Sequence, residues 1–257
     1  RAKWMLLLLG ALLFLVQRAL LWWTYAGTPI PYVPFADPVV YMNLARTWAA
    51  ENPMPAQAVF HPPLYPYLVG LVFRAFGDSM WKLIVVQNIA GVLAATAILG
   101  AVIWITGRLR PSLLTLLMLL QGGAWVAYEW RLYPDALSTS LQLLVLATLW
   151  LLWAGRKESD APPAPALPDL SSMRPIPALP QHALLALMGF LLAAAILLRP
   201  NLVLAIPLLG VWSLLPSARA RIGPYGVAYL VIAPALALAP FLMRNHAWRS
   251  EEHTSEL

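Results

Sequence analysis

Two aspartates stand where a carboxylate could do chemistry at the edge of an apolar segment. Asp37 lies between Phe35 and Val39, and Asp135 follows Pro134 at the start of a strongly apolar run. A carboxylate in such a place can take a proton from a hydroxyl group or bind a divalent cation through its oxygens. Each aspartate also stands at a predicted helix N-terminus, where it can cap free N–H groups instead. The residues alone leave catalysis and capping both open.

A second group of polar residues could bind an anion or a metal ion. Arg199 and Arg244 end two apolar runs, and Arg131 and Lys82 flank others. An arginine in this position suits a phosphate group at headgroup depth, or anchors the chain among lipid headgroups. His61 can serve as a metal ligand or a proton relay. The chain has no Cys, which excludes a thiolate metal site and a Cys nucleophile.

The elements that carry these residues are predicted to be membrane helices. Of the 257 residues, 61% are hydrophobic and 11% are charged, whereas soluble domains have about 25% charged residues. This composition excludes a water-soluble globule, a disordered chain and a coiled coil. The net charge of +6 is scattered singly or in pairs between apolar runs. It therefore indicates positive loops at a membrane face and not a nucleic-acid partner.

Seven apolar runs are predicted to cross the membrane, which gives an all-α, polytopic transmembrane helix bundle. They are Trp4–Tyr25, Met80–Thr106, Ser112–Trp130, Ala136–Ala154, His182–Leu198, Leu202–Leu215 and Tyr225–Met243. Between the first two, residues 26–79 form a long loop with juxtamembrane helices at Asp37–Ala50 and Pro62–Phe76. Residues 158–181 are predicted to be a proline-rich cytoplasmic linker, and Ser217–Gly223 a loop.

The basic residues orient these spans. With a cytoplasmic N-terminus, the cytoplasmic side receives the basic pairs Arg1/Lys3, Arg108/Arg110, Arg156/Lys157 and Arg219/Arg221. The outer membrane surface and the space beyond it then receive the acids Asp37, Glu51, Asp78, Glu129 and Asp135. Arg18 is the charge expected inside a span, where it must face protein or reach for the surface. Gln17, Gln87 and Asn88 are predicted to be interhelical hydrogen-bond partners.

Several segments together resemble a family of membrane glycosyltransferases. The first loop carries PFADPVVYMNLARTW and FHPPLYPYL, and later segments read YPDALSTSLQLLVL, ILLRPNLVLAIP and APFLMRNHAW. In this combination they are similar to the C-type superfamily, and closest to the family 39-like group of protein O-mannosyltransferases and aminoarabinose transferases. The resemblance covers about residues 7–248. Members are polytopic, with two juxtamembrane helices in a large first external loop.

The resemblance implies transfer of a sugar from a polyprenyl-phosphate donor, with inversion, to a lipid, glycan or protein acceptor on the external face. It implies that Asp37 is the catalytic base, within a motif that includes Tyr41. Asp135 would assist by binding a divalent metal ion or the acceptor.

The remaining site residues are assigned to the donor phosphate and the metal ion. Arg199 and Arg244 are candidates for the lipid phosphate, and Arg131 for a weaker substrate contact. His61 stands where the family often carries an acid and a lysine. It is therefore the candidate replacement as a metal ligand beside Asp135.

Two other functions stay open from the sequence, a transporter or lipid flippase and a non-catalytic scaffold. A transporter should carry ionisable groups at the bilayer midplane and inverted repeats. The sequence offers only Arg18 inside a span, and we detect no repeat. Acids scattered on both membrane faces would have indicated a scaffold.

The end of the chain is predicted to be non-native. Residues 249–257 read RSEEHTSEL, which resembles the translation of a short-read sequencing adapter. We therefore expect residues 1–248 to be the N-terminal part of a longer transmembrane domain, in an integral protein of a bacterial inner membrane. We also expect the 257-residue chain by itself to be inactive.

Overall fold

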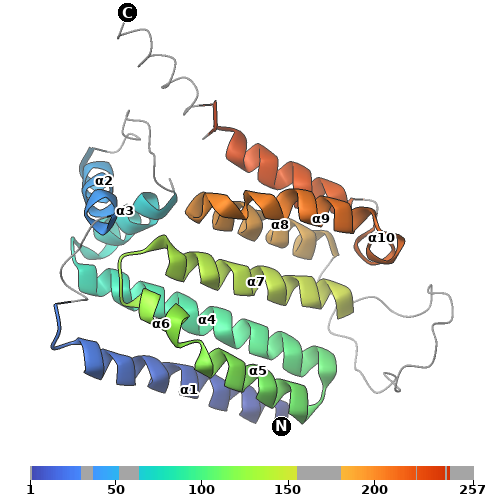
Figure 1. Cartoon of the computed structure of the whole chain (residues 1–257), viewed down its shortest axis with the longest axis horizontal. Coiled ribbons are helices and arrows are strands. Elements are labelled where there is room, and N and C mark those ends of the chain that lie inside the picture. Colours follow the sequence, from blue (N-terminus) through green and yellow to red (C-terminus); the bar gives the residue numbers. More distant parts are fainter. Residues whose placement is uncertain are drawn as a thin grey trace, which may run out of the picture.

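A computed structural model of the chain describes residues 2–29, 37–51, 64–154, 181–223, 225–240 and 242–243. Every regular element in these residues is a helix, and the long helices lie side by side (Figure 1). Four are long and apolar enough to cross a membrane: α1 (Ala2–Tyr25), α4 (Met80–Thr106), α7 (Pro134–Ala154) and α8 (Gln181–Leu198). The prediction of an all-helical protein is thus confirmed for the described residues, which include four helices of membrane-spanning length and hydropathy, whereas seven full spans are not confirmed.

Helix α4 is the central element of the bundle and begins and ends where the sequence predicts. It packs against α1 on one side and α7 on the other. Phe14 of α1 and Leu99 of α4 are among the buried side chains of the α1–α4 contact. The helix ends at Gly107, whose φ of 61° is left-handed and whose N–H donates to the carbonyl oxygen of Ile103.

The predicted third span, Ser112–Trp130, is wrong as a single helix. The structure has α5 (Leu109–Gln121) and then α6 (Gly123–Glu129), with a break at Gly122, where ψ is 45°. Two consecutive glycines stand at this break, and each costs a helix about 1 kcal/mol relative to alanine. Because α6 is short and packs on α4 and α7, its last residue lies inside the bundle.

The two helices predicted in the first loop are present as α2 (Asp37–Glu51) and α3 (Leu64–Phe76). They pack on each other through a buried cluster that contains Tyr41 and Tyr65. The guanidinium of Arg74 lies 4.4 Å over the ring of Trp48 and donates to backbone carbonyls at the end of α2. The pair is therefore a compact hairpin unit, and its position at a membrane surface stays a prediction.

The predicted sixth and seventh spans are helical but irregular, and neither is among the helices of membrane-spanning length. A 3₁₀ turn, η2 (Pro200–Leu204), leads into α9 (Ala205–Leu214), and a π-helical stretch, η3 (Ala228–Ile232), continues as α-helix toward residue 240. The loop prediction at Ser217–Gly223 is wrong, because this stretch is helix α10 (Pro216–Ile222). Its first residue is a proline, which favours a helix N-terminus. Of the predicted linker, residues 158–181, all but Gln181 lies outside the described residues.

Candidate functional site

Four of the sequence-predicted site residues lie at one end of the bundle, which we call the rim: Asp37, Tyr41, Asp135 and Arg199. This end carries α2, α3, the start of α7 and the end of α8 (Figure 1). Asp37 is the first residue of α2 and is exposed, and Tyr41 follows one turn later with 3% of its surface exposed. Asp135 lies in the first turn of α7, and Arg199 comes directly after α8.

An ion pair joins Asp135 to Arg199 and so ties α7 to α8 at this end. The side chains are 22% and 43% exposed, respectively. A pair this exposed contributes on the order of 0–1 kcal/mol to stability. Its main effect is on position, because it holds the Arg199 guanidinium at the rim. There a phosphate could replace the Asp135 carboxylate as the partner of the guanidinium.

The Tyr41 phenol lies within electrostatic range of two other site residues, Asp37 and Arg199. Burial raises the pKa of Tyr41, the negative charge of Asp37 raises it further, and the positive charge of Arg199 opposes this rise. Tyr133, from the turn before α7, also raises it. These effects require Asp37 and Arg199 to lie within electrostatic range of one phenol. Tyr41 therefore keeps its proton at neutral pH and can donate a hydrogen bond.

A buried amide lies behind this group. Tyr65 meets Tyr41 edge to face, with ring centroids 5.1 Å apart. Its hydroxyl donates to Oε1 of Gln87 at 2.9 Å. Nε2 of Gln87 donates to the backbone carbonyls of Glu129 and Arg131, at 3.1 Å each. The sequence predicts interhelical bonding by Gln87, which the structure confirms, but not its particular partners.

An ion pair that the sequence did not reveal lies deeper in the bundle. Nε and Nη2 of Arg18 donate to the two carboxylate oxygens of Glu129 at 2.8 and 2.7 Å, and both side chains are buried. The Glu129 carboxylate lies against Gly91, which is eleven residues into α4, or about 16 Å along its axis. The prediction that Glu129 lies at the outer surface is therefore wrong.

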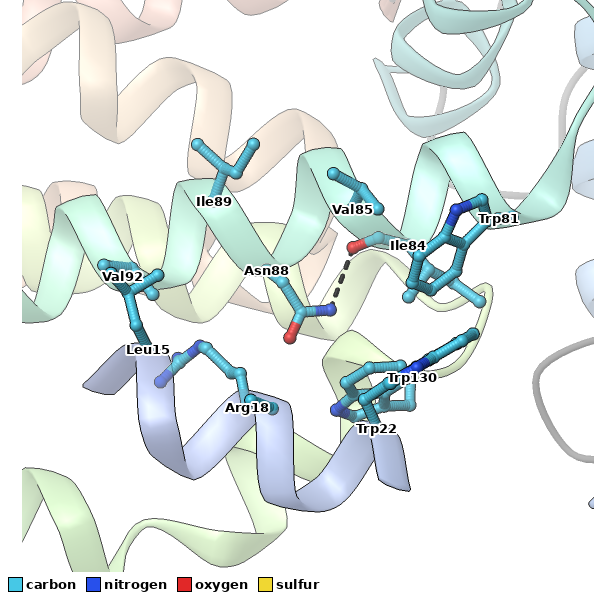
Figure 2. A pocket seen from close by; sticks show the side chains of 11 residues that line it. Leu15, Arg18, Trp22, Trp81, Ile84, Val85, Asn88, Ile89, Val92 and Trp130 are labelled. Atoms are coloured by element: carbon cyan, nitrogen blue, oxygen red, sulfur yellow. Dashed lines mark hydrogen bonds between the residues drawn. The ribbon is translucent and has the colours of Figure 1, made fainter. Parts of the chain in front are cut away.

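A cavity of about 230 Å³ lies between α1 and α4, next to this ion pair. Figure 2 shows Arg18 of α1 and Asn88 of α4 among its lining residues, with Nδ2 of Asn88 donating to the backbone carbonyl of Ile84. The Trp22 ring stacks on Trp130, with centroids 5.3 Å apart, and contacts Trp81 at a tilt of 40°, with centroids 3.9 Å apart. The surface of the cavity is apolar, and its lining includes none of the four rim residues. It is therefore separate from the candidate site.

The remaining predicted residues do not join the site in the described part of the chain. His61 and Arg244 lie outside the described residues. Arg131 is exposed on the turn before α7, where its backbone carbonyl accepts a hydrogen bond from Gln87. Within the described ranges, no three His, Cys, Asp or Glu side chains gather as a metal site would require.

Comparison with known proteins adds no assignment. No family model matches the chain, and neither a curated protein nor a solved structure does. The rim therefore has to be interpreted from its own chemistry: an exposed carboxylate, a protonated phenol, and a guanidinium held by a second carboxylate.

Proposed function

We propose that this chain belongs to a membrane glycosyltransferase, which moves a sugar from a polyprenyl-phosphate donor to an acceptor on the external face. The observation that supports this is the meeting of Asp37, Tyr41, Asp135 and Arg199 at one end of a bundle of membrane-length helices. These residues supply a base, a hydrogen-bond donor and an anion-binding group. The order of residues that resembles the glycosyltransferase family supports the choice of substrate.

In the proposed reaction Asp37 accepts the proton of an acceptor hydroxyl. The acceptor oxygen forms a bond to the anomeric carbon from the side opposite the phosphate, while the bond from that carbon to the phosphate oxygen breaks. The phosphate leaves with the bonding electrons, so the configuration at the anomeric carbon inverts. Arg199 neutralises the growing negative charge, and the Tyr41 hydroxyl donates a hydrogen bond to a substrate oxygen.

A divalent metal ion is not used in this scheme. Among the described residues, Asp135 is the predicted metal ligand, and its carboxylate is engaged by Arg199. A guanidinium in that place repels a cation, so the described donor set does not fit a metal ion. In our proposal, Asp135 therefore positions Arg199, and the guanidinium takes over the neutralisation of the phosphate.

The proposal is tested by the substitution Asp37→Asn in membranes that contain the natural full-length gene product. Loss of a general base should lower sugar transfer by about 100-fold or more, measured with a radiolabelled polyprenyl-phosphate sugar. Assembly of the protein should be unchanged. The matched control is Asp78→Asn, because Asp78 is an exposed acid of the same loop and is paired with Arg46. Full activity of the Asp37→Asn variant would remove Asp37 from the mechanism.

A transporter or lipid flippase is the second candidate, and the Arg18–Glu129 pair favours it. This pair puts ionisable groups deep within the helices, as transport proteins often do. Uptake of substrate by vesicles without covalent transfer would support this function. Replacement of both Arg18 and Glu129 by leucine should then abolish uptake, whereas a glycosyltransferase should keep its activity if it remains folded.

A further inference from the structure

We propose that Gln87 is a positioning residue that fixes the α2–α3 hairpin against the start of α7, and so sets the separation of Asp37 and Asp135. Its effect on catalysis rests on the proposed function. Its effect on geometry does not, because the hydrogen bonds of Gln87 exist whatever reaction occurs at the rim.

One buried amide joins three segments that are far apart in the chain. Gln87 of α4 is 0% exposed. Its oxygen accepts from Tyr65 of α3, and its nitrogen donates to the carbonyls of Glu129 and Arg131. Both donors and one acceptor position of the amide are thus used. All of the bonds are 2.9–3.1 Å long, within the normal range.

Each end of this link leads to a rim residue over a short path. Tyr65 packs edge to face on Tyr41, which lies one turn after Asp37 in α2. On the other side, Arg131 precedes Asp135 by four residues, in the turn that leads into α7. The amide is therefore positioned to set the distance between the two carboxylates, although it touches neither.

The chemistry of the link requires an amide. Two carbonyl oxygens face Nε2, so the reversed amide would place three acceptors together. An ionised carboxylate would do the same. A methionine has nearly the same shape but would leave a buried hydroxyl and two carbonyls without this partner, which is unfavourable for buried polar groups.

The absence of Cys makes a direct distance measurement practicable. Spin labels are attached to Thr47→Cys on α2 and Leu146→Cys on α7, both at exposed positions. Distances between the labels are measured by pulsed electron paramagnetic resonance on the chain in lipid nanodiscs. In the Gln87→Met variant we expect the distance distribution to broaden by about twofold or more, because the hairpin loses its anchor.

Two further variants separate positioning from general loss of stability. Gln17→Met removes a different interhelical bond, from Gln17 to the Leu120 carbonyl, and should leave the distribution narrow. Gln87→Glu is the conservative variant, because a neutral carboxylic acid accepts from Tyr65 and donates to one carbonyl. Its distribution should lie between those of the parent protein and Gln87→Met, and should broaden when the pH is raised. If Gln87→Met does not fold, Gln87→Glu decides the question by itself.

The outcomes distinguish this inference from the proposed function. In the natural full-length protein, Gln87→Met should lower sugar transfer by about 100-fold through misplacement of the base, whereas Gln87→Glu should restore part of the activity. If Asp37→Asn abolishes transfer but the Gln87 variants keep both the parent distances and rate, Gln87 does not position the site. If the distance distribution broadens in Gln87→Met but the unsubstituted protein itself transfers no sugar, the positioning role stands and the glycosyltransferase proposal fails.

Discussion

At the scale of single residues, the strongest electrostatic feature is the Arg18–Glu129 pair. Its two hydrogen bonds are short, and both side chains are buried. Removal of one partner leaves the other charge without compensation in an apolar interior. We expect Glu129→Ala to lower the free energy of unfolding by about 3–5 kcal/mol, measured by thermal unfolding in a fixed detergent.

The matched control replaces both charges. In Arg18→Leu/Glu129→Leu, no buried charge remains, and stability should return close to that of the parent protein, because apolar replacement of a buried pair is often neutral. A double variant as unstable as Glu129→Ala would contradict this explanation. It would mean that stability comes from the shape or other contacts of these side chains and not from the charge balance.

Buried tyrosines predict a dependence of stability on alkaline pH. Burial raises the pKa of Tyr65 well above its usual value, and the nearby Tyr41 raises it further. Below about pH 10 the phenol is neutral in both the folded and the unfolded state. Above this pH only the unfolded state releases the proton readily, so stability should fall as the pH rises. Tyr65→Phe should flatten the fall in unfolding temperature between about pH 9.5 and 11.5.

The exposed Tyr128 provides the control for this titration. It is 42% exposed, and Tyr128→Phe should keep the alkaline slope of the parent protein. An unchanged slope in Tyr65→Phe would show that other groups cause the alkaline instability.

At the scale of elements, the close approach of α6 to α4 depends on one glycine. A Cβ atom at Gly91 would collide with the Glu129 carboxylate and approach the Arg18 guanidinium. Gly91→Ala should therefore force the ion pair apart and destabilise the protein, although alanine favours a helix. Gly100 is the control in the same helix, because a Cβ there meets only Leu7 at 3.5 Å. We expect Gly100→Ala to be neutral or stabilising by thermal unfolding.

Element boundaries were predictable where a long apolar run ends in a clear signal. The run from Met80 ends at Gly107, and the predicted and observed helices agree. The broken third span was not predicted, since hydropathy averages over a window and does not detect a local change of ψ. The adjacent Gly122 and Gly123 were the feature of the sequence that indicated a helix break. At Pro216–Ile222, two arginines suggested a loop, whereas the proline and alanines favour the observed helix.

At the scale of the whole molecule, the orientation predicted from the basic residues can be tested by labelling. Thr47 belongs to α2, which lies at the rim end, and Arg110 belongs to the first turn of α5, which begins at the opposite end of the bundle (Figure 1). In intact cells, a membrane-impermeant maleimide should react with Thr47→Cys, whereas Arg110→Cys should react only after permeabilisation. The chain has no Cys to give background. The reverse pattern would invert the topology and move the rim to the cytoplasmic side.

The sequence also predicted part of the site. It placed Asp37, Asp135 and Arg199 at one end of the spans, and they share that end in the structure. It did not predict that Asp135 and Arg199 pair with each other, because pairing depends on how α7 and α8 pack. The Arg18–Glu129 pair could have been predicted more easily, since a charge within a span needs a partner and Glu129 is the second-last residue of another predicted span, Ser112–Trp130. The pairing was not predicted, because Glu129 was assigned with the other acids to the outer membrane surface.

The indoles of Trp22, Trp81 and Trp130, in which Trp22 contacts both of the others, come from α1, α4 and the residue after α6. Aromatic rings in such contact couple their electronic transitions, so together they act as a single chiral chromophore. Their near-ultraviolet circular dichroism should appear only when the first helix has docked on the other two. The indoles thus provide an intrinsic spectroscopic probe of helix docking, which needs no attached dye.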